Sequence, residues 1–219
     1  MNKLKNVEYM LQFITHKNDR YGYIEGAIEA LAGGCKWIQL RMKEATTDEL
    51  REAVKILKPA CAEKEAILVI DDHVELVAEL DADGVHLGKN DMPPAEARRL
   101  LGEKYIIGAT ANTIEDIRAL AVQDVDYIGL GPYRFTETKR NLSPVLGVEG
   151  YRRIMEACRA EGIEHPVVAI GGITIDDLQP LMDVGVSGIA LSGTILNAPS
   201  PRETTETILA MLNKIKYGE

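Results

Sequence analysis

The chain has 219 residues, of which 46% are hydrophobic, so it can bury one sizeable core as a single α/β barrel or as two small domains. Its net charge of −9 and pI near 5.1 argue against a general nucleic-acid or membrane-surface binder. The amino-terminal residues are too polar for a secretion signal, and no apolar run approaches the ~18 residues of a transmembrane helix. Cys35, Cys61 and Cys158 are odd in number and widely spaced, as expected of reduced thiols. We therefore expect a soluble cytoplasmic protein.

Short apolar runs bounded by turn residues recur along the chain and predict buried strands. These runs lie at residues 11–15, 36–40, 66–70, 84–87, 105–109, 126–130, 166–170 and 188–191. Most of them are too short to be helices, and all are rich in aliphatic residues. They indicate a sheet that is covered on both faces.

Stretches with apolar residues at helical spacing alternate with these strands. They lie at residues 23–32, 48–63, 74–80, 95–101, 114–122, 148–161, 175–184 and 203–216. We expect Thr47 to cap the second helix, Thr113 to cap the fifth, and Pro59 to disturb the last turn of the second.

Eight strand–helix units with short connections predict one domain over residues 1–219, an α/β fold of the closed (β/α)₈ TIM-barrel type. An open doubly wound sheet is the alternative. It lacks its usual glycine fingerprint here, because Pro132 follows Gly131 and no third glycine comes at the required spacing.

Acidic residues follow two neighbouring strands. Asp71 and Asp72 come after the third strand, and Asp91 follows the fourth. Because the carboxyl ends of parallel strands lie on one side of a barrel, Asp72 and Asp91 can converge on a hard cation such as Mg²⁺. Each aspartate alone could instead cap the following helix, and these residues by themselves leave both interpretations open.

Groups suited to anions occupy other strand ends. Gln39, Arg41 and Lys43 alternate, so they share one side while the chain stays extended, and they suit a charged anion beside a hydrogen-bonding ring. Gly172 and Gly193 follow the seventh and eighth strands, where backbone amides can approach a phosphate. His86, on an apolar strand, is expected to be a core or rim residue rather than a metal ligand.

Five motifs together resemble the thiamine-phosphate synthase family over nearly the whole chain. They are IQLRMK at 38–43, the acids at 71–72, DGVHLGKNDMP at 83–93, GLGPYRFTETK at 129–139 and AIGGIT at 169–174. The resemblance implies a TIM-barrel enzyme that joins 4-amino-2-methyl-5-(diphosphooxymethyl)pyrimidine to a thiazole phosphate. It also implies Mg²⁺ as the cofactor, and thiamine phosphate and diphosphate as the products.

The same resemblance implies roles for individual residues. It assigns the diphosphate to Arg41, Lys43 and Lys139 as catalytic residues, Mg²⁺ to Asp72 and Asp91, and the pyrimidine to Gln39. Thr110 stands near the diphosphate at the family's serine position, and Asp71 stands where the family usually has asparagine. The thiazole phosphate is assigned to Thr136, Thr138, Gly172, Ser192 and Gly193.

Two other functions stay open beside the synthase. One is a thiazole tautomerase-like relative on the same barrel, and the other is a sensor that binds phosphorylated ligands without turnover. The set of Asp72, Asp91 and Lys139 favours the synthase. In each case the expected partners are small molecules rather than nucleic acid or membrane, and homo-oligomerisation stays open.

Overall fold

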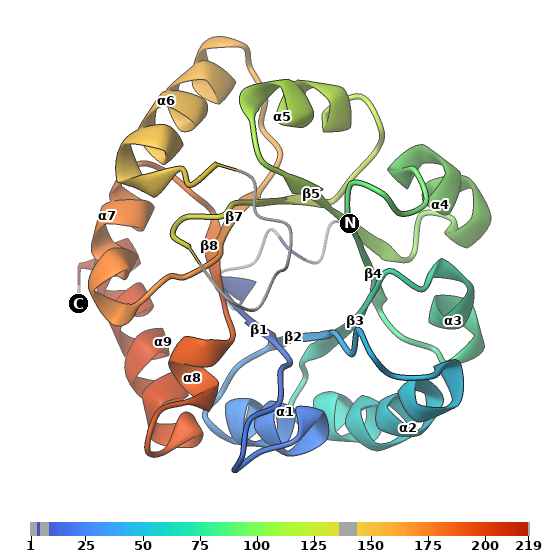
Figure 1. The fold of residues 1–219 in the computed structure, drawn as a ribbon. Coiled ribbons are helices and arrows are strands. Elements are labelled where there is room, and N and C mark those ends of the chain that lie inside the picture. The colour runs from blue at the N-terminus through green and yellow to red at the C-terminus, as the bar shows by residue number, and fades with distance from the viewer. Residues whose placement is uncertain (1–3, 5–8, 136–143, 219) are drawn as a thin grey trace.

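The computed structural model describes residue 4 and residues 9–135 and 144–218. Eight parallel strands pair in sequence order, and β1 also pairs with β8, so the sheet closes into a barrel. Helices form a ring outside the strands (Figure 1). The prediction of a (β/α)₈ TIM barrel is confirmed.

The strands are short, as the apolar runs predicted. They are β1 Leu11–Ile14, β2 Trp37–Leu40, β3 Ile67–Asp71, β4 Gly84–Leu87, β5 Ile106–Ala111, β6 Tyr127–Leu130, β7 Val167–Ile170 and β8 Gly188–Leu191. Two strands reach further toward their carboxyl ends than predicted. Asp71 is therefore the last residue of β3, and Thr110 lies within β5.

The helices follow the strands around the outside of the barrel. They are α1 Tyr23–Ala32, α2 Thr47–Glu63, α3 Val74–Glu79, α4 Pro94–Leu101, α5 Ile114–Leu120, α6 Gly147–Ala160, α7 Leu178–Asp183, α8 Gly193–Leu196 and α9 Pro201–Tyr217, with the short 3₁₀ helix η3 at Ile175–Asp177. The short helix α8 was not predicted.

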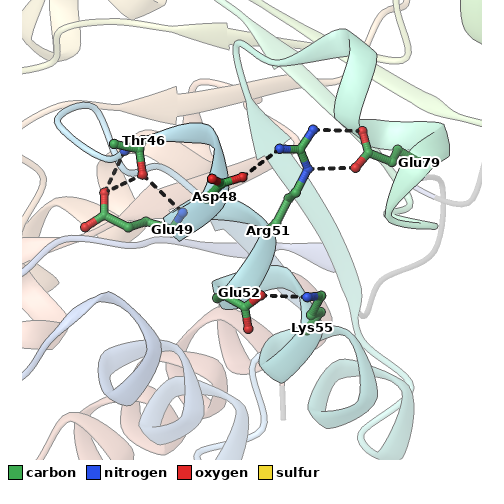
Figure 2. A network of polar contacts seen from close by, with 7 residues as sticks. All are labelled: Thr46, Asp48, Glu49, Arg51, Glu52, Lys55 and Glu79. Carbon is green, nitrogen blue, oxygen red and sulfur yellow. Dashed lines mark hydrogen bonds and ion pairs between the residues drawn. The ribbon is translucent and has the colours of Figure 1, made fainter.

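The amino terminus of α2 differs from the prediction. The N-cap is Thr46, not Thr47, because the Thr46 hydroxyl accepts from the Glu49 amide while the Glu49 carboxylate accepts from the Thr46 amide. Figure 2 shows this capping box. It also shows Arg51 between Asp48 and Glu79, which ties α2 to α3.

Pro59 does not disturb α2, and that prediction is wrong. The helix continues through Pro59 to Glu63. Pro59 lies on the exposed side of the helix, where the carbonyl that loses its partner can bond to water, while Leu57 and Cys61 pack into the core. Thr113 caps α5 as predicted, accepting from the Asp116 amide.

The core has two layers, as the two-residue period of a strand requires. Alternate residues of each strand point outward and pack with the helices in one large cluster. The others point into the barrel, where Trp37, Val69, Ile106, Tyr127 and Val168 belong to a smaller cluster. Polar residues share these inward positions: Gln12 near the amino end of β1, and Gln39, Asp71 and His86 nearer the carboxyl ends of their strands.

The three cysteines are buried and unpaired, in agreement with reduced thiols. None of the helices in the described ranges combines the length and the apolar character that a bilayer-spanning segment needs.

Candidate active site at the carboxyl rim

The carboxyl rim, meaning the carboxyl ends of the strands and the loops that follow them, brings Gln39, Arg41 and Asp71 together. Gln39 Nε2 donates to Asp71 Oδ1 at 2.9 Å, and Arg41 Nε lies 3.4 Å from Asp71 Oδ2. The Thr15 hydroxyl fixes the Arg41 backbone, because it accepts from the Arg41 amide at 2.9 Å and donates to the Arg41 carbonyl at 3.1 Å. Asp71 thus contacts Gln39 of β2 and Arg41 just after that strand, two residues that the family resemblance assigned to substrate.

Asp72 leaves β3 in a conformation that few residues adopt. Its φ of 68° lies in the left-handed region, which costs a non-glycine residue energy but is tolerated best by aspartate and asparagine. Its amide donates to the His86 carbonyl of β4 at 2.9 Å. This turn places the Asp72 carboxyl near the Asp91 carboxyl, which raises the pKa of Asp72.

Asp91 is held in the loop after β4. Its Oδ2 accepts from the Gly88 amide at 2.6 Å, and a Cβ at position 88 would lie 2.7 Å from that oxygen, so glycine allows this close approach. None of Asp71, Asp72 and Asp91 caps the helix that follows, because the N-cap residues of α3 and α4 are His73 and Pro93 and neither helix has a side-chain cap.

The paired acids carry more negative charge than their surroundings neutralise. Burial raises the pKa of Asp71 to about 7, with a further contribution from Asp72, although Arg41 and Lys43 oppose the shift. Burial and the Asp91 carboxyl raise the pKa of Asp72 to about 6. The carboxylates of Asp72 and Asp91 fit Mg²⁺, which is commonly held by one or two protein carboxylates together with substrate phosphates and waters.

The part of the chain that the structure describes contains no group of three or more His, Cys, Asp or Glu side chains arranged to bind a metal. A cation at Asp72 and Asp91 would therefore take its remaining ligands from substrate and water. Asp91 and Thr110 line one cleft, together with Gly88 and Lys89. The cleft therefore reaches from Asp91 to Thr110 of β5.

A second set of groups lies across the barrel at β7 and β8, where Ile170 pairs with Ala190, so the turns at Gly172 and Gly193 are neighbours. Gly172 has a φ of 68°, and its carbonyl accepts from Arg134 Nη1 at 2.8 Å. Ser192 precedes α8 without capping it, and Gly193 opens that helix. These turns can present backbone amides to a phosphate.

Arg134 and Asp177 brace the Gly172 turn. Arg134 donates to both oxygens of Asp177, at 2.7 and 2.9 Å, and the Tyr133 hydroxyl donates to Asp177 Oδ1 at 3.0 Å. The Thr174 amide and hydroxyl donate to the same carboxylate. Burial raises the pKa of Asp177, but these donors outweigh it and hold that pKa well below its usual range.

The remaining predicted residues fall in three groups. Lys43 is exposed at the rim, near enough to lower the pKa values of Asp71 and Asp72. Thr110 is half-buried on β5. Thr136, Thr138 and Lys139 lie outside the described residues.

Sequence reasoning did not single out Gln12, Tyr127 or Asp177. Gln12 and Tyr127 face into the barrel and are buried there, and His86 contacts Tyr127 as a buried residue, in agreement with its prediction. The available signal was the alternation of side chains along a strand, which places every second residue inside the barrel. A polar residue at such an inward position needs a hydrogen-bond partner there. Asp177 was detectable as the third residue after Thr174, a capping-box spacing.

The chain is similar in sequence to known proteins over most of its length. A family model described as thiamine monophosphate synthase matches residues 11–195. The chain is 59% identical over 206 residues to a thiamine-phosphate synthase of Bacteroides thetaiotaomicron, covering 94% of this chain and 99% of that one. It is 43% identical over 211 residues to the thiamine-phosphate synthase of Flavobacterium johnsoniae, covering 95% and 96% of the two chains.

Solved structures show the same likeness. A thiamine phosphate pyrophosphorylase from Pyrococcus furiosus superposes with a TM-score of 0.83 at 34% identity, covering 95% of this chain and 97% of that one. A 3-hexulose-6-phosphate synthase superposes with a TM-score of 0.65 at only 16% identity, so that likeness concerns the fold alone.

Proposed function

Since the chain belongs to the thiamine monophosphate synthase family, we propose a division of the family's reaction among the residues of its carboxyl rim. The enzyme condenses 4-amino-2-methyl-5-(diphosphooxymethyl)pyrimidine with thiazole phosphate to give thiamine phosphate and diphosphate. The observation that carries the division is the meeting of Asp72 and Asp91 on the same rim as Gln39, Arg41 and the Gly172 turn.

Gln39 binds the pyrimidine in this account. Its Nε2 is occupied by Asp71, which leaves Oε1 to accept from the exocyclic amino group of the substrate. Asp71 therefore sets the orientation of the Gln39 amide. An amino group whose hydrogen is held by Oε1 can release electron density into the ring as the diphosphate departs.

Asp72 and Asp91 hold Mg²⁺, which when bound neutralises part of the charge that grows on the departing diphosphate. Arg41, Lys43 and Lys139 supply further positive charge to the same group. Asp71 draws Arg41 to one side in the free protein, and we propose that the diphosphate competes with Asp71 for the guanidinium.

The thiazole phosphate lies at the opposite side of the rim. The amides near Gly172 and Gly193, with Ser192, Thr136 and Thr138, hold its phosphate. This places the thiazole nitrogen to attack the exocyclic carbon of the pyrimidine once the carbon–oxygen bond has broken. The reaction then needs no protein nucleophile, because the rim supplies binding and charge stabilisation.

One assay separates this account from its two alternatives. Purified protein is mixed with the pyrimidine diphosphate, the thiazole phosphate and Mg²⁺, and the products are followed by chromatography. We expect thiamine phosphate and diphosphate in equal amounts. Binding of both substrates without product would indicate a sensor, and isomerisation of a thiazole carboxylate phosphate alone would indicate a tautomerase-like enzyme.

The proposed setting is the cytoplasm, where both substrates are small soluble phosphorylated molecules. The formal net charge of −9 fits small-molecule partners better than nucleic acid.

A further inference from the structure

Four side chains form a continuous line of hydrogen bonds through the interior of the barrel to its carboxyl rim. Gln12 Nε2 lies 3.2 Å from the Tyr127 hydroxyl, which lies 2.9 Å from His86 Nδ1. His86 Nε2 lies 3.0 Å from Thr110 Oγ1. The first three are buried, and Thr110 is half-buried at the rim, so the line ends in the site.

The barrel backbone leaves space for this line at two glycines. A Cβ at Gly108 would lie 2.0 Å from Cζ of Tyr127 and 2.5 Å from its hydroxyl oxygen. A Cβ at Gly129 would lie 3.0 Å from Cε1 of His86. Any larger residue at position 108 would displace the tyrosine ring, which packs edge-on against Trp37 with ring centroids 4.7 Å apart.

The donors in this line run in one direction. The Gln12 amide nitrogen donates to the Tyr127 oxygen. Burial raises the pKa of Tyr127, so the phenol keeps its hydrogen and donates it to His86 Nδ1. A neutral imidazole that accepts at Nδ1 carries its hydrogen on Nε2, and this hydrogen is donated to Thr110 Oγ1.

The direction of these hydrogen bonds decides whether the Thr110 hydroxyl can donate to a ligand. When His86 donates to the Thr110 oxygen, the hydroxyl hydrogen is free to point into the site. The opposite tautomer would accept that hydrogen at Nε2 and leave the threonine with only lone pairs, which an anion would avoid.

We propose that Tyr127 and His86 are positioning residues that fix the Thr110 hydroxyl as a hydrogen-bond donor to the departing diphosphate. This inference rests on the proposed function, because it takes the diphosphate to lie beside Thr110. The donation gains strength as charge grows on the leaving oxygen, so the line serves the transition state more than the bound substrate.

The tautomer of His86 is read directly by NMR of protein labelled with ¹⁵N-histidine, without substrate. Two-bond proton–nitrogen correlations distinguish a ring protonated at Nε2 from one protonated at Nδ1, and His86→Gln identifies the signals. We expect the Nε2–H form in the wild type and its loss from Tyr127→Phe. Tyr151→Phe is the matched control, since Tyr151 is also buried and loses a hydroxyl but lies outside the barrel, and it should leave the His86 signals unchanged.

Steady-state kinetics test the link to Thr110. Tyr127→Phe should lower kcat about tenfold with little change in KM, as expected for one hydrogen bond that acts in the transition state. In a Thr110→Val background the same change should have almost no further effect, since the last donor is already gone. Thermal denaturation of each variant checks that it folds.

Three results would overturn the proposal: an Nδ1–H or doubly protonated His86 in the wild type, additive effects in the double variant, or an effect of Tyr127→Phe confined to KM. The NMR result needs no turnover, so it is distinguishable from a failure of the proposed function, which would appear as absence of thiamine phosphate in the wild type.

Discussion

Gln39 donates a hydrogen bond to Asp71 at 2.9 Å across the neighbouring strands β2 and β3. The carboxylate can only accept when ionised, so it fixes which end of the Gln39 amide faces it. The same carboxylate lies beside Arg41. Asp71 therefore links the pyrimidine residue to one of the proposed diphosphate residues.

Asp71→Asn tests the charge at this link. The variant keeps a side chain that can accept from Gln39, so we expect it to stay active. Loss of a buried negative charge next to Asp72 should raise the Mg²⁺ concentration for half-maximal rate by roughly tenfold, equivalent to ~1.4 kcal/mol of charge interaction. A Mg²⁺ titration of both proteins at saturating substrates measures this, and an unchanged or lower requirement would rule out a contribution of Asp71 to the metal.

The acidic cluster should bind Mg²⁺ more tightly as pH rises. The pKa values of Asp71 and Asp72 are raised to about 7 and about 6, so at lower pH a cation must displace protons. Mg²⁺ affinity should increase as pH rises through this range, with proton release. Calorimetry in buffers of different ionisation enthalpy measures both quantities, and a pH-independent affinity without proton release would contradict the raised pKa values.

The same shifts make a prediction for the metal-free protein. Carboxyls with raised pKa values hold protons at a pH where the unfolded chain, with aspartate near ~3.9, has released them. Their contribution to the free energy of unfolding is therefore fully present below about pH 4 and is lost as pH rises toward 7. In the presence of chelator, the free energy of unfolding should therefore fall less steeply with rising pH in Asp71→Asn than in the wild type.

Asp177 should show the opposite sign. Its pKa is depressed, so its contribution to stability is present above the unfolded value near ~3.9 and declines as pH falls below it. Asp177→Asn should be less stable than the wild type at pH 7, with a difference that narrows in acid. Because Asp177 braces the Gly172 turn through Arg134, the variant should also raise KM for thiazole phosphate; urea unfolding at several pH values and steady-state kinetics provide the measurements.

Lys139 should act on the departing diphosphate rather than on binding alone. Removing one such contact costs roughly 2–4 kcal/mol in the barrier, so Lys139→Ala should lower kcat by about 30- to 900-fold. Lys214, on α9 near the carboxyl end of the chain, offers a matched control, and Lys214→Ala should keep full activity. An effect of Lys139→Ala on KM alone would mean that the lysine stabilises the bound substrate and the transition state equally.

The barrel was predictable because its signals are local. Each strand is an apolar run that ends in polar residues, as in 67–71, and each helix shows an apolar stripe, so the alternation alone implies a parallel closed sheet. Pro59 was misjudged because helix propensity cannot tell that its position faces water.

The rim was predictable only in outline. Strand ends share one side of a barrel, which is enough to gather Asp72, Asp91 and Arg41. Which side chains contact one another depends on the tertiary structure. Neither the hydrogen bond from Gln39 to Asp71 nor the left-handed backbone conformation of Asp72 follows from local sequence. The line from Gln12 to Thr110 joins strands that are far apart in the sequence and needs the closed barrel to exist.

The most direct test of the whole account is the rate of thiamine phosphate formation by wild type, Asp91→Asn and Asp48→Asn, with Mg²⁺ and with excess chelator. The amide oxygen that Asp91→Asn places at this position can still accept from the Gly88 amide, so the loop should keep its shape. Asp48 lies exposed on α2 (Figure 2) and serves as the control. We predict that chelator abolishes wild-type turnover, that Asp91→Asn loses most of it, and that Asp48→Asn keeps it. Full activity of the wild type in chelator, or of Asp91→Asn with Mg²⁺, would contradict the account.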